Sequence, residues 1–167
     1  KILVDTGQTP GVAVGEFPVD GFFKQFDNNP GFASEGDVGF GINPHDTVYY
    51  NVLENLTYWD GSSFQSPAAA TQIRVDNNGA PDTIIGSTSG AQPGAHAPLA
   101  NGIGQADGLG NLHSHLSFFL EPNPSPAPAY GVYGLQLSLS SSAVGSTASD
   151  PFFIAFNFGL SESQFVD

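Results

Sequence analysis

The sequence contains no cysteine and no methionine, and only three of its 167 residues are basic. Without cysteine, the chain has no disulfide, no thiolate nucleophile and no Cys-type zinc site. The absence of Met even at position 1 leads us to expect the mature part of a longer, secreted precursor. No run of about 18 apolar residues occurs, so we expect no membrane-spanning segment.

The charge of the chain is strongly one-sided. Sixteen acidic residues stand against Lys1, Lys24 and Arg74, which gives a net charge of −13. A phosphate backbone needs Lys and Arg to displace its counterions, so we expect no nucleic-acid partner. A negative field concentrates cations, and divalent cations are therefore the expected partners. The same charge could serve solubility alone.

Glycine, proline and the scarcity of charge all disfavour helices. The 21 Gly and 13 Pro interrupt helices, and 11% charged residues leave little for exposed helix faces. Only residues 160–167 show a helical pattern, and residues 86–111 predict a long loop or irregular edge. The segment 150–158 is apolar enough for a strand buried on both faces near the centre of a sheet. Turn-separated apolar segments predict strands over residues 46–53, 57–59, 71–75, 83–85, 112–120, 130–140 and 150–158. We predict one all-β domain over residues 1–167, an antiparallel β-sandwich or jelly roll.

The clearest chemical motif is the pair His113 and His115 in residues 112–116. Residues i and i+2 of a strand face the same way, about 6–7 Å apart, so both imidazoles share one face. Imidazole binds Zn²⁺, Cu²⁺ or Ni²⁺, and two on one strand can bind one ion. The pair therefore predicts a zinc-type site. The alternative is a pair of exposed histidines on an edge strand.

The candidate third and fourth ligands for this ion are Glu121, Asp107 and His96. Glu121 has the parity of the histidines but lies about 20 Å beyond His115 along an extended strand, so a bulge or bend would be needed. Asp107 and His96, in the preceding loop, are the other candidates. His45 follows a proline and is interpreted as a turn residue.

An acidic turn over residues 76–82 offers oxygen ligands. Ca²⁺ takes about six to eight oxygens, so Asp76, Asn78 and Asp82 are candidate calcium ligands. The same string, with its Asn-Gly pair, is also a strong hairpin signal, which explains these residues without an ion.

The histidine string followed by Glu121 resembles the first motif of the cupins. Five residues separate His115 from Glu121, which is longer than the cupin spacing. No histidine occurs in residues 150–159, where a second motif would fall. This partial likeness would imply a metalloenzyme that uses the same two histidines.

A broader resemblance is to secreted bacterial proteins, typical of cyanobacteria and planctomycetes, that often carry a C-terminal PEP-CTERM sorting tail. It rests on residues 51–63, 112–116, 130–137 and 149–157. The resemblance implies an exported, divalent-metal-binding β protein, periplasmic or at the cell surface, and it supplies no activity.

Taken together, the sequence favours an extracytoplasmic metal-binding protein without catalysis, because no base–nucleophile pair accompanies the histidines. A cupin-like metalloenzyme is one alternative. A cell-surface or matrix module stabilised by Ca²⁺ is another. An open coordination position in a concave pocket would indicate the enzyme, whereas a surface-exposed site would indicate binding.

Overall fold

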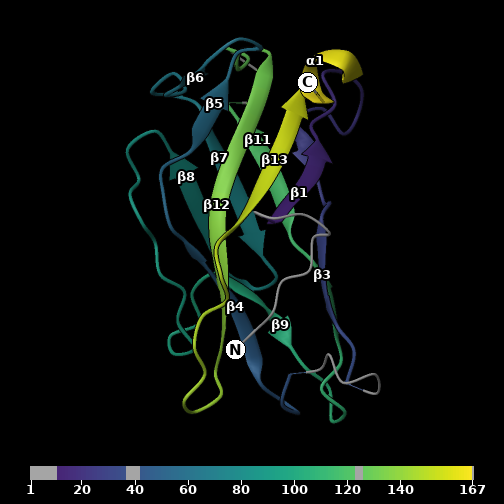
Figure 1. Cartoon of the computed structure of the whole chain (residues 1–167), viewed down its shortest axis with the longest axis vertical. Coiled ribbons are helices and arrows are strands. Elements are labelled where there is room, and N and C mark those ends of the chain that lie inside the picture. Colours follow the sequence, from purple (N-terminus) through teal and green to yellow (C-terminus); the bar gives the residue numbers. More distant parts are fainter. Residues whose placement is uncertain (1–10, 37–41, 123–125, 167) are drawn as a thin grey trace.

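The structure, a computed structural model, describes residues 11–36, 42–122 and 126–166, and almost all of its regular elements are strands (Figure 1). The all-β prediction is confirmed. The elements are β1 (Gly11–Glu16), β2 (Phe26–Asp27), β3 (Gly31–Ser34), β4 (Thr47–Val52), β5 (Thr57–Trp59), β6 (Phe64–Gln65), β7 (Gln72–Asn77), β8 (Ala80–Gly86), β9 (Gly102–Gln105), β10 (Leu112–His115), β11 (Ser117–Glu121), β12 (Gly131–Ser141), β13 (Phe152–Phe158) and α1 (Glu162–Val166). No helix within these ranges has the length and apolar character needed to cross a membrane.

The strands form a sandwich of two facing sheets, with a small third sheet beside them. The first sheet has the order β1-β13-β12-β4-β9, with β5 paired to β12 and β6 to β5. The second has the order β2-β11-β7-β8, and β10 pairs with β3 separately. Figure 1 shows β12 and β13 in front of β7 and β11. Among the described strand pairs, β1–β13 is parallel and the others are antiparallel.

The core lies between the two large sheets and is built by period-2 alternation. In β4, residues Val48, Tyr50 and Val52 are buried while their neighbours are half-buried. Aromatic contacts join the layers, because Phe118 of β11 lies 4.9 Å from Phe156 of β13, ring centre to ring centre. Each such fully buried side chain stabilises the fold by roughly 1.5–3 kcal/mol.

Three segments differ from the sequence prediction or add detail to it. The strand predicted near the sheet centre, β13, lies second from the edge, and Phe153 and Ala155 on its outer face are only half-buried. Residues 86–111, predicted as a long loop or an irregular edge, contain β9, an edge strand whose register against β4 shifts between Val48 and Tyr49. The predicted strand 112–120 is divided at the buried Leu116, because β10 pairs with β3 whereas β11 joins the second sheet beside β7.

Candidate metal-binding site

The two histidines project from β10, which lies antiparallel to β3. His113 is opposite Ala33 and His115 is opposite Gly31. Both imidazoles belong to exposed residues, and their Nε2 atoms are 3.1 Å apart. Two zinc–nitrogen bonds of about 2.0–2.1 Å at a tetrahedral angle place the nitrogens about 3.3 Å apart. The pair is therefore already close to the spacing that one ion requires.

A hydrogen bond to the backbone sets the tautomer of His115. Its Nδ1 lies 2.8 Å from the carbonyl oxygen of Asn28, and a carbonyl can only accept, so Nδ1 carries the proton. Nε2 of His115 is then left with its lone pair, which accepts a hydrogen bond from Nε2–H of His113. Histidines that bind metals commonly donate their other ring N–H to a carbonyl in this way.

Gly31 makes room for the His115 ring. A Cβ atom at this position would lie 2.6 Å from Cε1 of His115, closer than two carbons approach without a bond. The ring can therefore lie against the backbone of β3 and reach Asn28. Any larger residue at position 31 would have to displace it.

The opposite face of β10 is fixed by polar contacts. Nδ2 of Asn78, at the tip of the β7–β8 hairpin, donates to Oγ of Ser114 at 2.9 Å and to the carbonyl of His115 at 3.2 Å. The Ser114 hydroxyl donates to the carbonyl of Ile103 at 2.7 Å. These contacts hold the strand that carries both imidazoles and so reduce the cost of ordering the site.

Glu121, a candidate ligand, is turned toward Arg74 instead of the histidines. Its carboxylate accepts from Nε of Arg74 at 2.9 Å and from Nε2 of Gln72 at 2.8 Å. The guanidinium also pairs with Asp82 at 3.0 Å and lies 3.9 Å from the centre of the Phe119 ring. Partial desolvation opposes its charge, but the two carboxylates raise the pKa of Arg74 above its usual value.

Neither Asp107 nor His96 joins the two histidines in a group of three metal ligands. Oδ1 of Asp107 accepts from the backbone N–H of Leu109 at 2.8 Å and of Asn111 at 2.9 Å, which closes a tight loop. Hydrogen bonds from Asn111 are the main reason that the pKa of Asp107 is below its usual value. His96 is exposed. His45 lies in a turn with φ of 62°, as its interpretation as a turn residue predicts.

The candidate calcium ligands are spread over the β7–β8 hairpin. Asn78 and Gly79 form its two-residue turn, with φ of 48° and 98°. Asp76 is exposed, Asp82 pairs with Arg74, and the amide of Asn78 is engaged by β10. Across residues 11–36, 42–122 and 126–166, no three His, Asp or Glu side chains gather into a group that could hold a metal ion. Of the candidate metal ligands, the fold brings His113 and His115 close together.

No protein-family model and no curated protein sequence matches the chain.

Strand parity was enough to predict that His113 and His115 share a face. Sequence reasoning missed the contributions of Asn28, Gly31 and Asn78. Asn28 acts through a backbone carbonyl, which every residue has, so no side-chain pattern could have identified it.

Proposed function

We propose that the protein is an extracytoplasmic metal-binding β-sandwich in which His113 and His115 bind one zinc-type ion through their Nε2 atoms. The observation that carries this proposal is the 3.1 Å separation of the two Nε2 atoms. The tautomer that Asn28 imposes on His115 supports it, because this tautomer places the lone pair of His115 on Nε2, where an ion would take the place of the Nε2 proton of His113 between the two nitrogens.

Two protein ligands leave coordination positions for water or for a group from another molecule. The ion would be held reversibly at the surface, because both histidines are exposed. A net charge of −13 raises the local concentration of cations around such a site. Among divalent ions, Cu²⁺ should bind more tightly than Ni²⁺ or Zn²⁺ to the same imidazoles.

Exposure favours binding over catalysis, because an active site usually excludes water from the reacting atoms. The cupin-like alternative would need Glu121 beside the histidines, and Glu121 is held by Arg74 and Gln72. The extracytoplasmic location rests on the resemblance of residues 51–63, 112–116, 130–137 and 149–157 to exported bacterial proteins.

Calorimetric titration of Zn²⁺ tests the proposal. The purified chain should bind one ion, and replacing both His113 and His115 by Ala should abolish that binding. A chain with His45 and His96 replaced by Ala has lost the same number of imidazoles and should still bind. Unchanged zinc binding in the first variant would contradict the proposal, as would equal loss in both. A stoichiometry of one ion to two chains would mean that a second copy supplies further ligands.

A further inference from the structure

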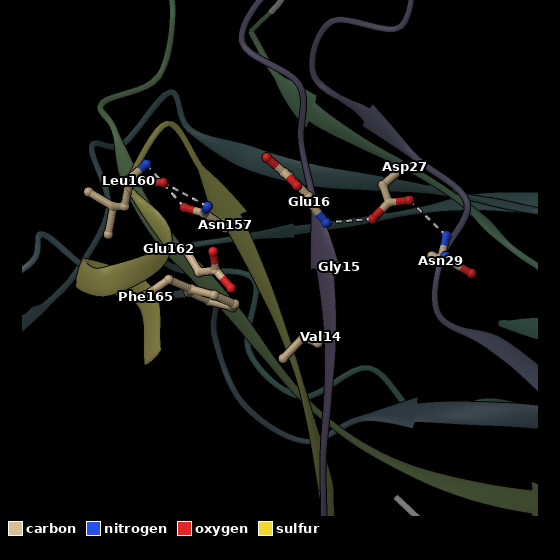
Figure 2. A pocket seen from close by; sticks show the side chains of 9 residues that line it. All are labelled: Val14, Gly15, Glu16, Asp27, Asn29, Asn157, Leu160, Glu162 and Phe165. Carbon is tan, nitrogen blue, oxygen red and sulfur yellow. Dashed lines mark hydrogen bonds between the residues drawn. The ribbon is translucent and has the colours of Figure 1, made fainter. Parts of the chain in front are cut away.

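An open hollow of about 520 Å³ lies over β1, between α1 and the segment that follows β2 (Figure 2). Glu162 and Phe165 extend from α1 toward β1, and Asp27 reaches β1 from the other side. Val14 and Glu16, both exposed residues of β1, lie between them. This volume is within the range of about 300–1,000 Å³ that is usual for small-molecule sites.

A second hollow of about 270 Å³ adjoins the first, because Glu16 and Asp27 line both. Its apolar wall consists of Pro18, Phe23 and Phe26. The two hollows together form a groove, which we call the β1 groove. It has apolar surface at each end, with Glu16 and Asp27 between the two ends and Glu162 beside Phe165 on α1.

The walls of the β1 groove are fixed by internal hydrogen bonds. The Asp27 carboxylate accepts from the backbone N–H of Glu16 at 2.7 Å and from that of Asn29 at 2.9 Å. The side chain of Asn157 bonds both to the N–H and to the carbonyl of Leu160, at 3.1 and 3.0 Å, which sets where α1 begins. A ligand would therefore meet a site that is already formed, which lowers the cost of binding.

The aromatic wall is anchored as well. Gln25 is buried, and its Nε2 donates to the carbonyl of Leu120 at 2.8 Å, which ties the segment that carries Phe23 to β11. Phe23 contacts Phe26 at 5.8 Å between ring centres, and Phe26 contacts Phe119 at 5.1 Å. Phe23 nevertheless remains 60% exposed, so a large apolar ring is held in place and faces solvent.

The groove also offers acceptors that the protein does not use. Glu16 and Glu162 are exposed, and neither carboxylate is hydrogen-bonded or ion-paired to another residue of the described ranges. The residues that line the two hollows include no Lys or Arg. A ligand should therefore carry hydrogen-bond donors and should not be an anion.

We propose that the β1 groove binds a neutral oligosaccharide. A sugar ring has an apolar C–H face, which can cover an aromatic ring, and a rim of hydroxyl groups, which donate to carboxylates. In the groove, Phe23 and Phe165 could be covered by the apolar C–H face of a sugar. Glu16 and Glu162 could accept hydrogen bonds from its hydroxyl groups. Uronic-acid or sulfated chains are disfavoured by the net charge of −13. A small cation would not need the apolar walls. A basic peptide is the competing ligand.

The test is a calorimetric titration, in EDTA, with neutral hexasaccharides of glucose, mannose and N-acetylglucosamine. Polygalacturonate serves as the anionic chain and octalysine as the basic peptide. We expect at least one neutral hexasaccharide to bind and polygalacturonate not to bind. Phe23→Ala and Phe165→Ala should each weaken that binding about two- to tenfold. Phe64→Ala is the matched control, because Phe64 is 81% exposed on β6 and lines neither hollow.

Failure of every neutral hexasaccharide to bind would overturn the proposal. So would equal loss in the Phe64 variant. Octalysine binding that disappears at high salt, without sugar binding, would assign the groove to basic peptides. His115 contacts Asn28, which lines the second hollow, so His113→Ala is the variant that separates the two proposals. Because EDTA is present throughout, this variant should leave sugar binding unchanged while it weakens zinc binding in the absence of EDTA.

Discussion

The backbone carbonyl of Asn28 accepts a hydrogen bond from Nδ1 of His115 at 2.8 Å. Asn28 belongs to the turn between β2 and β3, whereas His115 ends β10, so this one bond joins segments 87 residues apart. It fixes the rotation of the ring as well as its tautomer. The geometry of the metal site therefore depends on the turn, and changes in the turn should be detectable as changes in metal affinity.

Replacing Gly31 by Ala should weaken zinc binding about tenfold or more, in the range seen when a partner of a metal ligand is removed. The added methyl would lie 2.6 Å from the His115 ring and would displace it from Asn28. Gly86→Ala is a matched control, because its added carbon would lie 3.8 Å from its nearest neighbour, an ordinary contact. Calorimetry measures both affinities, and equal affinities in the two variants would contradict the geometry described for His115.

Zinc affinity should decrease as the solution is made more acidic. A proton on Nε2 occupies the lone pair that the ion needs, so protons and metal compete for His113 and His115. Titrations in buffers with different ionisation enthalpies count the protons released on binding. The count should rise as the pH is lowered, because the ion must then displace more protons from the two imidazoles. A proton count that does not vary with pH would indicate that the ion is bound elsewhere.

Replacing Arg74 by Ala should destabilise the fold by about 1–2 kcal/mol. The change removes the cation–π contact with Phe119 and the partly exposed pairs with Glu121 and Asp82. Urea unfolding measures this loss, and part of it should disappear at high salt.

The same Arg74 variant also tests the ligand set of the metal site. It releases the Glu121 carboxylate, which in the native fold accepts from Arg74 and Gln72. We expect unchanged zinc affinity, because Glu121 is not brought to the histidines. A tighter site in this variant would show that Glu121 becomes a ligand once Arg74 no longer holds it.

The fold should lose stability in alkaline solution because of Tyr50 and Tyr133. Burial raises the pKa of both hydroxyls above the usual value for tyrosine. The raised pKa favours the neutral form in the fold, so the unfolded chain loses its protons first. Stability is then fully present below pH of about 10 and is lost as the pH rises above it.

A Tyr50→Phe variant isolates this effect. At neutral pH it should cost about 1–2 kcal/mol, because the buried Oδ1 of Asn77 loses the hydrogen bond that Tyr50 donates at 2.7 Å. Above pH of about 10, however, its stability should fall less steeply than that of the unchanged chain. Urea unfolding at several alkaline pH values measures both slopes, and parallel slopes would exclude Tyr50 as the cause.

The sequence was most informative where a pattern repeats along one strand. Alternation predicted β12, and β-branched and aromatic residues predicted β4. The period of two also placed His113 and His115 on one face. The Asn-Gly pair at Asn78 and Gly79 predicted the hairpin turn, whose backbone has positive φ at both positions. These features depend on neighbours in the chain, which local propensity can describe.

The features that the sequence did not reveal depend on pairing between distant segments. The predicted strand 112–120 is divided at Leu116 because β10 pairs with β3, whereas β11 pairs with β7 in another sheet. Glu121 is drawn to Arg74 by the register of β11 against β7, which no pattern within residues 112–121 specifies. The β1 groove likewise combines β1, the segment after β2, and α1, which are far apart in the sequence.

The parallel pairing of β1 with β13 has a consequence for the way the chain is made. Gly11 pairs with Phe152, 141 residues later in the chain (152 − 11), so β1 has no partner until β13 has been synthesised. At about 5–20 residues per second, that wait lasts roughly 7–30 s. During it, Phe17 lacks the ring of Phe156, on which it stacks at 4.6 Å. Until β13 has been made, the edge of β1 is open to strands of other nascent chains, which makes the order of synthesis an aggregation hazard.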